Sequence, residues 1–156
     1  MKIRATVDVA ADISTVFESF RDLRFAAKYI RDISNLEILD GGPAKMVVGS
    51  RWRETRVLLG REASEVMWVT EMSQPTSYSV AAVSHGTEYL SQYIFSILAP
   101  DRTRVVVLFT GRPYTLLARV VGVLGIFAAR TIRKLTTADL EDLARAVEAN
   151  AKELAR

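Results

Sequence analysis

Apolar and polar residues alternate along residues 2–9, which is the pattern of a half-buried β-strand. Four apolar side chains share one face of this strand: Ile3, Ala5, Val7 and Val9. The spacing then changes to three and four residues, with Asp12 in the N-cap position of a short amphipathic helix. A second short helix is predicted over residues 25–32, so the chain opens with a strand and a helical pair.

After Asn35 the pattern returns to a period of two, and clusters of Gly, Pro and Asp interrupt it. These interruptions predict six strands, over residues 36–39, 51–59, 62–72, 78–84, 88–98 and 104–110. From Tyr114 to the end the apolar spacing is helical. Consecutive antiparallel strands must bury one face, and the terminal helix is the only predicted element long enough to cover it. We therefore expect an α+β fold in which a curved antiparallel sheet of about seven strands wraps around a long C-terminal helix.

The segment 115–135 is the most apolar part of the chain. A membrane-spanning helix needs roughly 20 apolar residues, whereas Arg119 and Arg130 border the uninterrupted apolar run here. The segment is therefore predicted to be a buried core helix.

Composition limits the possible classes of protein. The chain has 156 residues, of which 49% are hydrophobic and 25% charged, as in an ordinary globular protein. We expect a single domain over residues 1–156. Cysteine is absent, which excludes disulfides and thiolate chemistry, and nothing demands an oxidising compartment. The N-terminus lacks the pattern of a signal peptide, and a cytoplasmic location is expected.

Several segments together resemble a known superfamily. They are VFESFRDLRFAAKYI, VGSRWRE, VTEMSQP, DRTRVVV and TTADLEDLARAVE. With the order of elements, they resemble the START-like, helix-grip superfamily (SRPBCC, Bet v 1-like), in particular its polyketide cyclase/dehydrase and lipid-transport branch. This resemblance implies that the sheet grips the last helix around a cavity for an apolar or amphipathic small molecule, such as a lipid or polyketide. Many relatives carry tryptophan where Tyr29 stands, at the cavity's entrance end.

Strand and helix periodicity predict which side chains face such a cavity. From the strands and the second short helix we expect ligand contacts by Tyr29, Trp52, Glu54, Tyr78, Val80, Tyr89 and Tyr93. From the last helix we expect Leu117, Val121, Leu124 and Ala128, with the small residues Gly122 and Gly125 leaving room. The alternative is that the aromatic side chains fill a solid core. The inward or outward phase of Trp68 stays open.

Candidate catalytic chemistry is sparse. His85, the only histidine, lies in a predicted turn. Glu54 shares the phase of Trp52, and an apolar surrounding would disfavour its charged form and suit it as an acid. Alternatively, neighbouring arginines pair with Glu54 on an exposed strand. No cofactor-binding motif occurs, and a metal site is not expected with one histidine and no cysteine.

Charge and exposed apolar positions predict the remaining partners. No acidic residue occurs between Asp101 and Asp139, so this stretch is basic and could contact an anionic membrane surface or an acidic ligand; a solvated basic face is the alternative. Nucleic-acid binding is not indicated. A homodimer is predicted through the outer face of the last two strands, which would present five apolar side chains: Leu90, Ile94, Leu98, Val106 and Leu108.

Three functions remain open from the sequence. The first is a non-catalytic binder or carrier of a hydrophobic or amphipathic small molecule. The second is a polyketide cyclase, aromatase or dehydratase that uses Glu54 and a cavity tyrosine. The third is a peripheral membrane or protein-partner module.

Overall fold

The computed structural model describes residues 1–58, 60–121 and 125–156, and the side chains of 121 and 125–127 are not described. The strands are β1 (Lys2–Val9), β2 (Ile33–Ile38), β3 (Arg51–Leu58), β4 (Arg61–Ser73), β5 (Ser77–Ser84), β6 (Thr87–Ala99) and β7 (Arg102–Pro113). The helices are α1 (Ile13–Phe20), α2 (Leu23–Tyr29), α3 (Leu116–Val121) and α4 (Gly125–Leu154).

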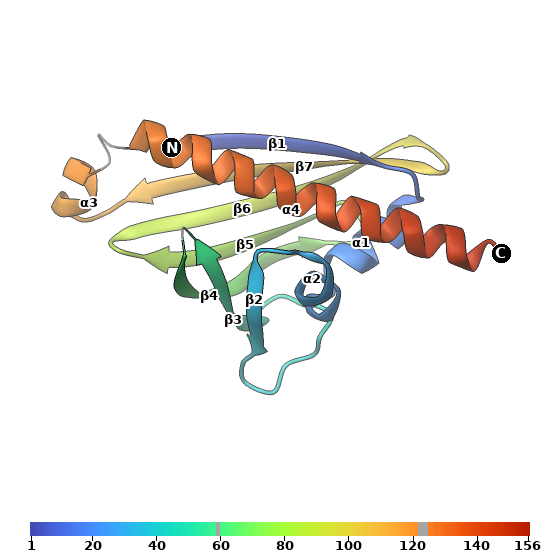
Figure 1. Cartoon of the computed structure of the whole chain (residues 1–156), viewed down its shortest axis with the longest axis horizontal. Helices are drawn as coiled ribbons and strands as arrows, with labels where there is room; N and C mark the ends of the chain where they lie inside the picture. Colours follow the sequence, from blue (N-terminus) through green and yellow to red (C-terminus); the bar gives the residue numbers. More distant parts are fainter. Residues whose placement is uncertain (59, 122–124) are drawn as a thin grey trace.

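The strands form one antiparallel sheet in the order β1-β7-β6-β5-β4-β3-β2. Neighbours in sequence are therefore neighbours in the sheet from β2 to β7, and β1 closes the far edge beside β7. Helix α4 runs along one face of the sheet, while α1 and α2 cover its end (Figure 1). The predicted α+β helix-grip fold is confirmed.

The core lies where the C-terminal half of α4 meets α1 and the sheet. Asp12 caps α1 by accepting a hydrogen bond from the backbone N–H of Thr15 at 3.1 Å. The spacing of the apolar residues in α1 then buries Phe17, whose ring meets the edge of Phe95 with centroids 5.1 Å apart. The largest fully buried side chains include Phe17, Leu140, Val9, Val105 and Val147.

The sequence left open which face of the sheet Glu54 and Trp68 occupy, and the strand pairing decides both. Glu54 pairs with Glu65 and Trp52 pairs with Met67, and both pairs lie on the face toward α4. Trp68 pairs with the exposed Arg51 and therefore lies on the opposite face.

One expectation about the apolar segment 115–135 is wrong. Leu116, Leu117 and Val120 are exposed instead of buried, and Leu117 is 74% exposed. The reason is geometric: β7 ends at Pro113, so α3 lies beyond the end of the sheet that would have covered it (Figure 1). The backbone N–H groups of Tyr114 and Thr115 hold this end in place by donating to the carbonyl oxygen of Gly86, at 3.0 and 3.4 Å.

The outer face of β6 and β7 is less exposed than the sequence suggested. Leu90 and Leu98 are exposed, Ile94 and Leu108 are half-buried, and Val106 is buried even in a single copy. The homodimer through this face stays a prediction.

Asp142 joins α4 to the segment between α2 and β2. Its side chain is buried and accepts hydrogen bonds from the backbone N–H of Arg31 at 3.1 Å and from Arg31 Nε at 3.2 Å. Arg145 also pairs with this carboxylate. Burial alone would raise the pKa of Asp142, but the Arg31 hydrogen bonds and the charges of both arginines outweigh it and hold the pKa below its usual value.

The variant Asp142→Asn tests this link. Because the folded-state pKa is lowered, the carboxylate stabilises the fold above the unfolded-state value of about 3.8, and this stabilisation disappears as the pH falls through the folded-state pKa. We expect the variant to lose about 1–2 kcal/mol of unfolding free energy at neutral pH, a modest figure because both arginines are largely exposed. Urea unfolding measures this loss. Equal stability of Asp142→Asn and the exposed control Glu141→Gln would contradict the prediction.

Candidate functional site

A cavity of about 320 Å³ lies between the sheet, α4 and the two short helices. Its volume is within the range of about 300–1,000 Å³ that is typical of small-molecule sites. The wall from the helices consists of Phe20, Leu23, Ala26, Ile30, Ile132, Leu135, Thr136, Asp139, Leu140 and Leu143. Most of the wall is apolar, with a few polar groups that converge from β3, β4, β6 and α4.

Six of the predicted ligand contacts line this cavity. They are Trp52, Glu54, Tyr78, Val80, Tyr89 and Tyr93. The rings of Tyr78 and Tyr93 stack with centroids 4.6 Å apart, and the Tyr78 hydroxyl donates to the carbonyl oxygen of Phe20 at 3.3 Å. Tyr78 and Tyr93 therefore pack against each other as core residues do, and they also line the cavity. Each of the two alternatives from the sequence, a solid aromatic core and a cavity wall, is thus partly right.

The other predicted contacts whose side chains are described do not line it. Tyr29 packs against Phe25, with ring centroids 4.6 Å apart. Leu117 is exposed because α3 lies beyond the end of the sheet. Ala128 is exposed as well, and the first residue of α4 with a described side chain that lines the cavity is Ile132, one turn later. Leu124 lies outside the described residues, and so do Gly122 and the side chain of Val121.

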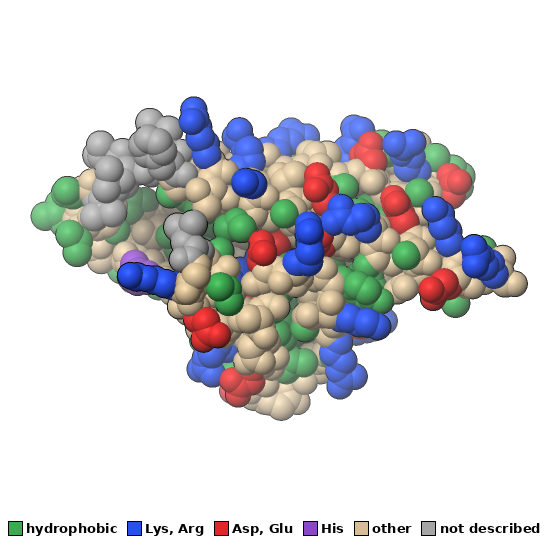
Figure 2. Space-filling model, in the orientation of Figure 1, with side chains coloured by type: hydrophobic (Ala, Val, Ile, Leu, Met, Phe, Trp, Pro, Cys, Tyr) green, Lys and Arg blue, Asp and Glu red, His purple; other side chains and the backbone are tan. Residues whose placement is uncertain are grey.

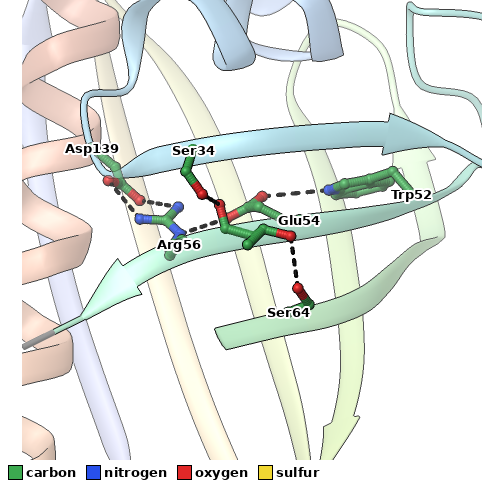
Figure 3. A network of polar contacts seen from close by, with 7 residues as sticks. Ser34, Trp52, Glu54, Arg56, Ser64 and Asp139 are labelled. Atoms are coloured by element: carbon green, nitrogen blue, oxygen red, sulfur yellow. Dashed lines mark hydrogen bonds and ion pairs between the residues drawn. The ribbon is translucent and has the colours of Figure 1, made fainter. Parts of the chain in front are cut away.

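An ion-pair network of the buried Glu54 and the half-buried Arg56 and Asp139 crosses the cavity wall from β3 to α4. Arg56 donates through Nη1 and Nη2 to the two carboxylate oxygens of Asp139, at 3.1 and 2.8 Å, and through Nε to Glu54 Oε1 at 2.5 Å. Trp52 Nε1 donates to the second oxygen of Glu54 at 3.4 Å. Figure 3 shows Arg56 between the two carboxylates, with Trp52 beyond Glu54. All three nitrogens of the guanidinium are thus used within the protein.

Burial sets the electrostatics of this network. It raises the pKa of Asp139 despite the opposing hydrogen bond and charge of Arg56, and the charge of Glu54 adds to the increase. Burial alone would lower the pKa of Arg56, but its hydrogen bonds and the charges of Asp139 and Glu54 raise it, so the guanidinium stays charged. The pKa of Tyr93 is also raised, mainly by burial and then by the charge of Asp139. Tyr93 therefore stays a neutral hydroxyl in the cavity.

The sequence left Glu54 open between a cavity-facing acid and a partner of the neighbouring arginines on an exposed strand. In the structure Glu54 is buried on the cavity wall and is also paired with Arg56. Asp139 and Glu65 were not predicted as lining residues. Arg51 and Arg53 form exposed ion pairs with Asp40 and Glu37 and not with Glu54. The phase of Arg56 could have been recognised, because it alternates with Trp52 and Glu54 on the inward face.

Asp139 also carried a signal in the sequence. It stands four residues after Leu135 and four before Leu143, which places a carboxylate within the apolar stripe of the helix. Among the described residues, no group of three or more His, Asp or Glu side chains is arranged to hold a metal ion.

A curved antiparallel sheet that encloses a cavity against one long helix defines the class of START-like, helix-grip proteins. The family described as "Polyketide cyclase / dehydrase and lipid transport" matches residues 1–148. The chain belongs to this family. No functionally curated protein matches its sequence.

Solved structures of low sequence identity share the fold. A protein from Thermus thermophilus superposes with a TM-score of 0.79 at 17% identity, covering 96% of this chain and 99% of its own. The Zhui aromatase/cyclase from a Streptomyces species gives 0.76 at 16%, covering 97% and 95%. A START superfamily protein from Mycobacterium smegmatis gives 0.66 at 18%, covering 98% of each chain. At these identities the similarity establishes the fold alone.

The opposite pKa shifts of Asp139 and Asp142, one turn apart on α4, provide an internal comparison. In a carbon-detected NMR titration we expect the carboxyl of Asp139 to titrate above 3.8 and that of Asp142 below it. In Arg56→Met the pKa of Asp139 should rise further, because the guanidinium that lowers it is gone. A midpoint for Asp139 at or below 3.8 in the unmodified protein would contradict the expectation that burial outweighs the pairing with Arg56.

Proposed function

We propose that this protein binds a hydrophobic or amphipathic small molecule in the cavity between sheet and α4, as a binding protein or carrier. The observation that carries the proposal is the cavity itself, which is partly open and mostly apolar and has a small number of polar groups in its lining. Membership of a family that includes lipid transport supports it. Binding requires no catalytic group, only apolar side chains and a few polar groups, and the cavity lining has both.

Filling the cavity tests this proposal. Ala82 and Val83 are neighbours on β5, but Ala82 is buried on the cavity wall and Val83 is exposed on the other face. We expect Ala82→Phe to abolish retention of a co-purified ligand in native mass spectrometry of protein from its own host. The control Val83→Phe should retain it. Ligand retention by both folded variants would place binding elsewhere.

An enzyme of the cyclase, aromatase or dehydratase type is the second candidate, because a proton-transfer group and a cation meet in the cavity. Glu54 or Asp139 could accept a proton from the carbon beside a carbonyl, and the Arg56 guanidinium could stabilise the resulting enolate oxygen. One structural neighbour is described as an aromatase/cyclase. However, both carboxylates already occupy Arg56 and oppose a further negative charge, so binding remains the first proposal. Adjacent polyketide synthase genes would favour the enzyme.

We also propose that α3 forms a transient contact with an anionic membrane surface. None of the described helices is long and apolar enough to cross a membrane. Leu116, Leu117 and Val120 are 78%, 74% and 65% exposed, and Arg112 and Arg119 lie beside them in the chain. Figure 2 shows apolar side chains gathered at this end of the molecule. Exposed leucines flanked by arginines, with no acidic residue from 102 to 138, suit shallow insertion among anionic lipids.

Vesicle flotation tests this contact. The double variant Leu116→Ser and Leu117→Ser should lower binding to vesicles of phosphatidylglycerol and phosphatidylcholine by more than about tenfold. Leu154→Ser changes an equally exposed leucine near the C-terminus and should bind like the unmodified protein. Binding should also weaken with added salt. Failure of the unmodified protein to bind these vesicles at low salt would refute the proposal.

A further inference from the structure

The cavity wall is acidic, although the protein as a whole is basic. Glu54, Glu65 and Asp139 line the cavity, and Arg56 is the one cationic side chain among its described lining residues. The chain's formal net charge is +3. Charge is therefore separated between a basic exterior and an acidic interior.

The single cation among these described lining residues is already paired with two carboxylates. Its Nε, Nη1 and Nη2 atoms each donate one hydrogen bond to Glu54 or Asp139. An anionic ligand would either displace one of these carboxylates from Arg56, which is costly, or approach the two remaining N–H groups against the negative charge of both carboxylates.

Glu65 adds a further negative charge on the same wall. It stands opposite Glu54 across the β3–β4 pair and is half-buried. No ion pair within the described part of the chain neutralises it, since Arg56 is paired with Glu54 and Asp139. Like charges directly opposite one another in a sheet are destabilising. A positively charged or hydrogen-bond-donating group between these carboxylates would relieve that repulsion.

We propose that the cavity selects an amphipathic molecule whose polar end is a protonated amine, or an uncharged hydrogen-bond donor, and discriminates against carboxylates and phosphates. This inference rests on the proposed function and deepens it. The apolar part of the ligand lies against the tyrosines and the Ile132–Leu135 face of α4, and its polar end lies toward Glu54, Glu65 and Asp139. Fatty acids and intact anionic lipids are thereby disfavoured as cargo.

A matched series of ligands tests the selection. Decylamine, decanol and decanoate share one alkyl chain and differ in the charge of the polar end. Isothermal titration calorimetry at neutral pH and low ligand concentration should give decylamine an affinity at least about tenfold higher than that of decanoate. Attraction by the basic exterior would favour decanoate, so a preference for the amine must come from the cavity. Equal affinities, or a preference for decanoate, would overturn the inference.

Two variants assign the effect to the cavity wall. Glu65→Gln removes a negative charge without breaking an ion pair in the described structure and should reduce the preference for decylamine several-fold. Asp139→Asn keeps an oxygen that can accept a hydrogen bond from Arg56 and should act in the same direction. The control Glu37→Gln removes an exposed carboxylate that pairs with Arg53, and it should leave the preference unchanged. A preference that is insensitive to Glu65→Gln and Asp139→Asn, or equally sensitive to Glu37→Gln, would also overturn the inference.

The decanol titration separates this inference from the function on which it rests. If neither decanol nor decylamine binds, and the Ala82→Phe variant behaves like the unmodified protein with a native ligand, the proposed cavity function fails. If decanol binds and decanoate binds at least as tightly as decylamine, the cavity function stands and only the charge selection fails.

Discussion

One constraint governs this structure: a single helix must cover the concave face of a seven-stranded antiparallel sheet. A sheet with one apolar face is stable only when that face is removed from water. The C-terminal half of α4 meets this demand by direct packing, with Leu140, Leu143 and Val147 buried against the sheet and α1. Toward its N-terminal half the helix and sheet do not pack fully against each other, and the cavity lies there.

The ion-pair network holds the helix and sheet together where apolar packing ends. Arg56 on β3 reaches Asp139 on α4, one residue before the buried Leu140. Breaking such a pair would leave a poorly solvated charge, so separation of the two elements at this point is disfavoured. The same groups make the interior acidic, while the exposed arginines near α3 make that end of the exterior basic. On the two proposals above, anionic lipid head groups are attracted to the surface but disfavoured inside.

The sequence was a good guide to this fold because strand alternation and turn residues are local signals. β1 was predicted with the bounds that the structure shows, and the other strands within a few residues. The apolar stretch 115–135 was misinterpreted because hydrophobicity indicates a preference for burial but not whether a partner surface is near. Whether Leu117 is covered depends on where β7 ends relative to α3, and this is a property of the tertiary structure.

The candidate site was predictable to a smaller extent. The inward phase of Trp52 and Tyr93 follows from alternation within a strand. The pairing of Arg56 with Asp139 joins residues 83 positions apart, and no local pattern specifies it. The opposition of Glu54 and Glu65 required the register of β3 against β4, which depends on the hairpin between them. The charge of the interior therefore became visible only when these separate elements were brought together.

Trp52 gives this cavity an optical property. Its indole is buried on the cavity wall beside Glu54, whereas Trp68, the other tryptophan, lies on the opposite face of the sheet. A molecule that entered the cavity as we propose would change the surroundings of Trp52 and leave those of Trp68 unchanged. The protein would then carry an intrinsic fluorescent reporter of its own occupancy, which needs no label.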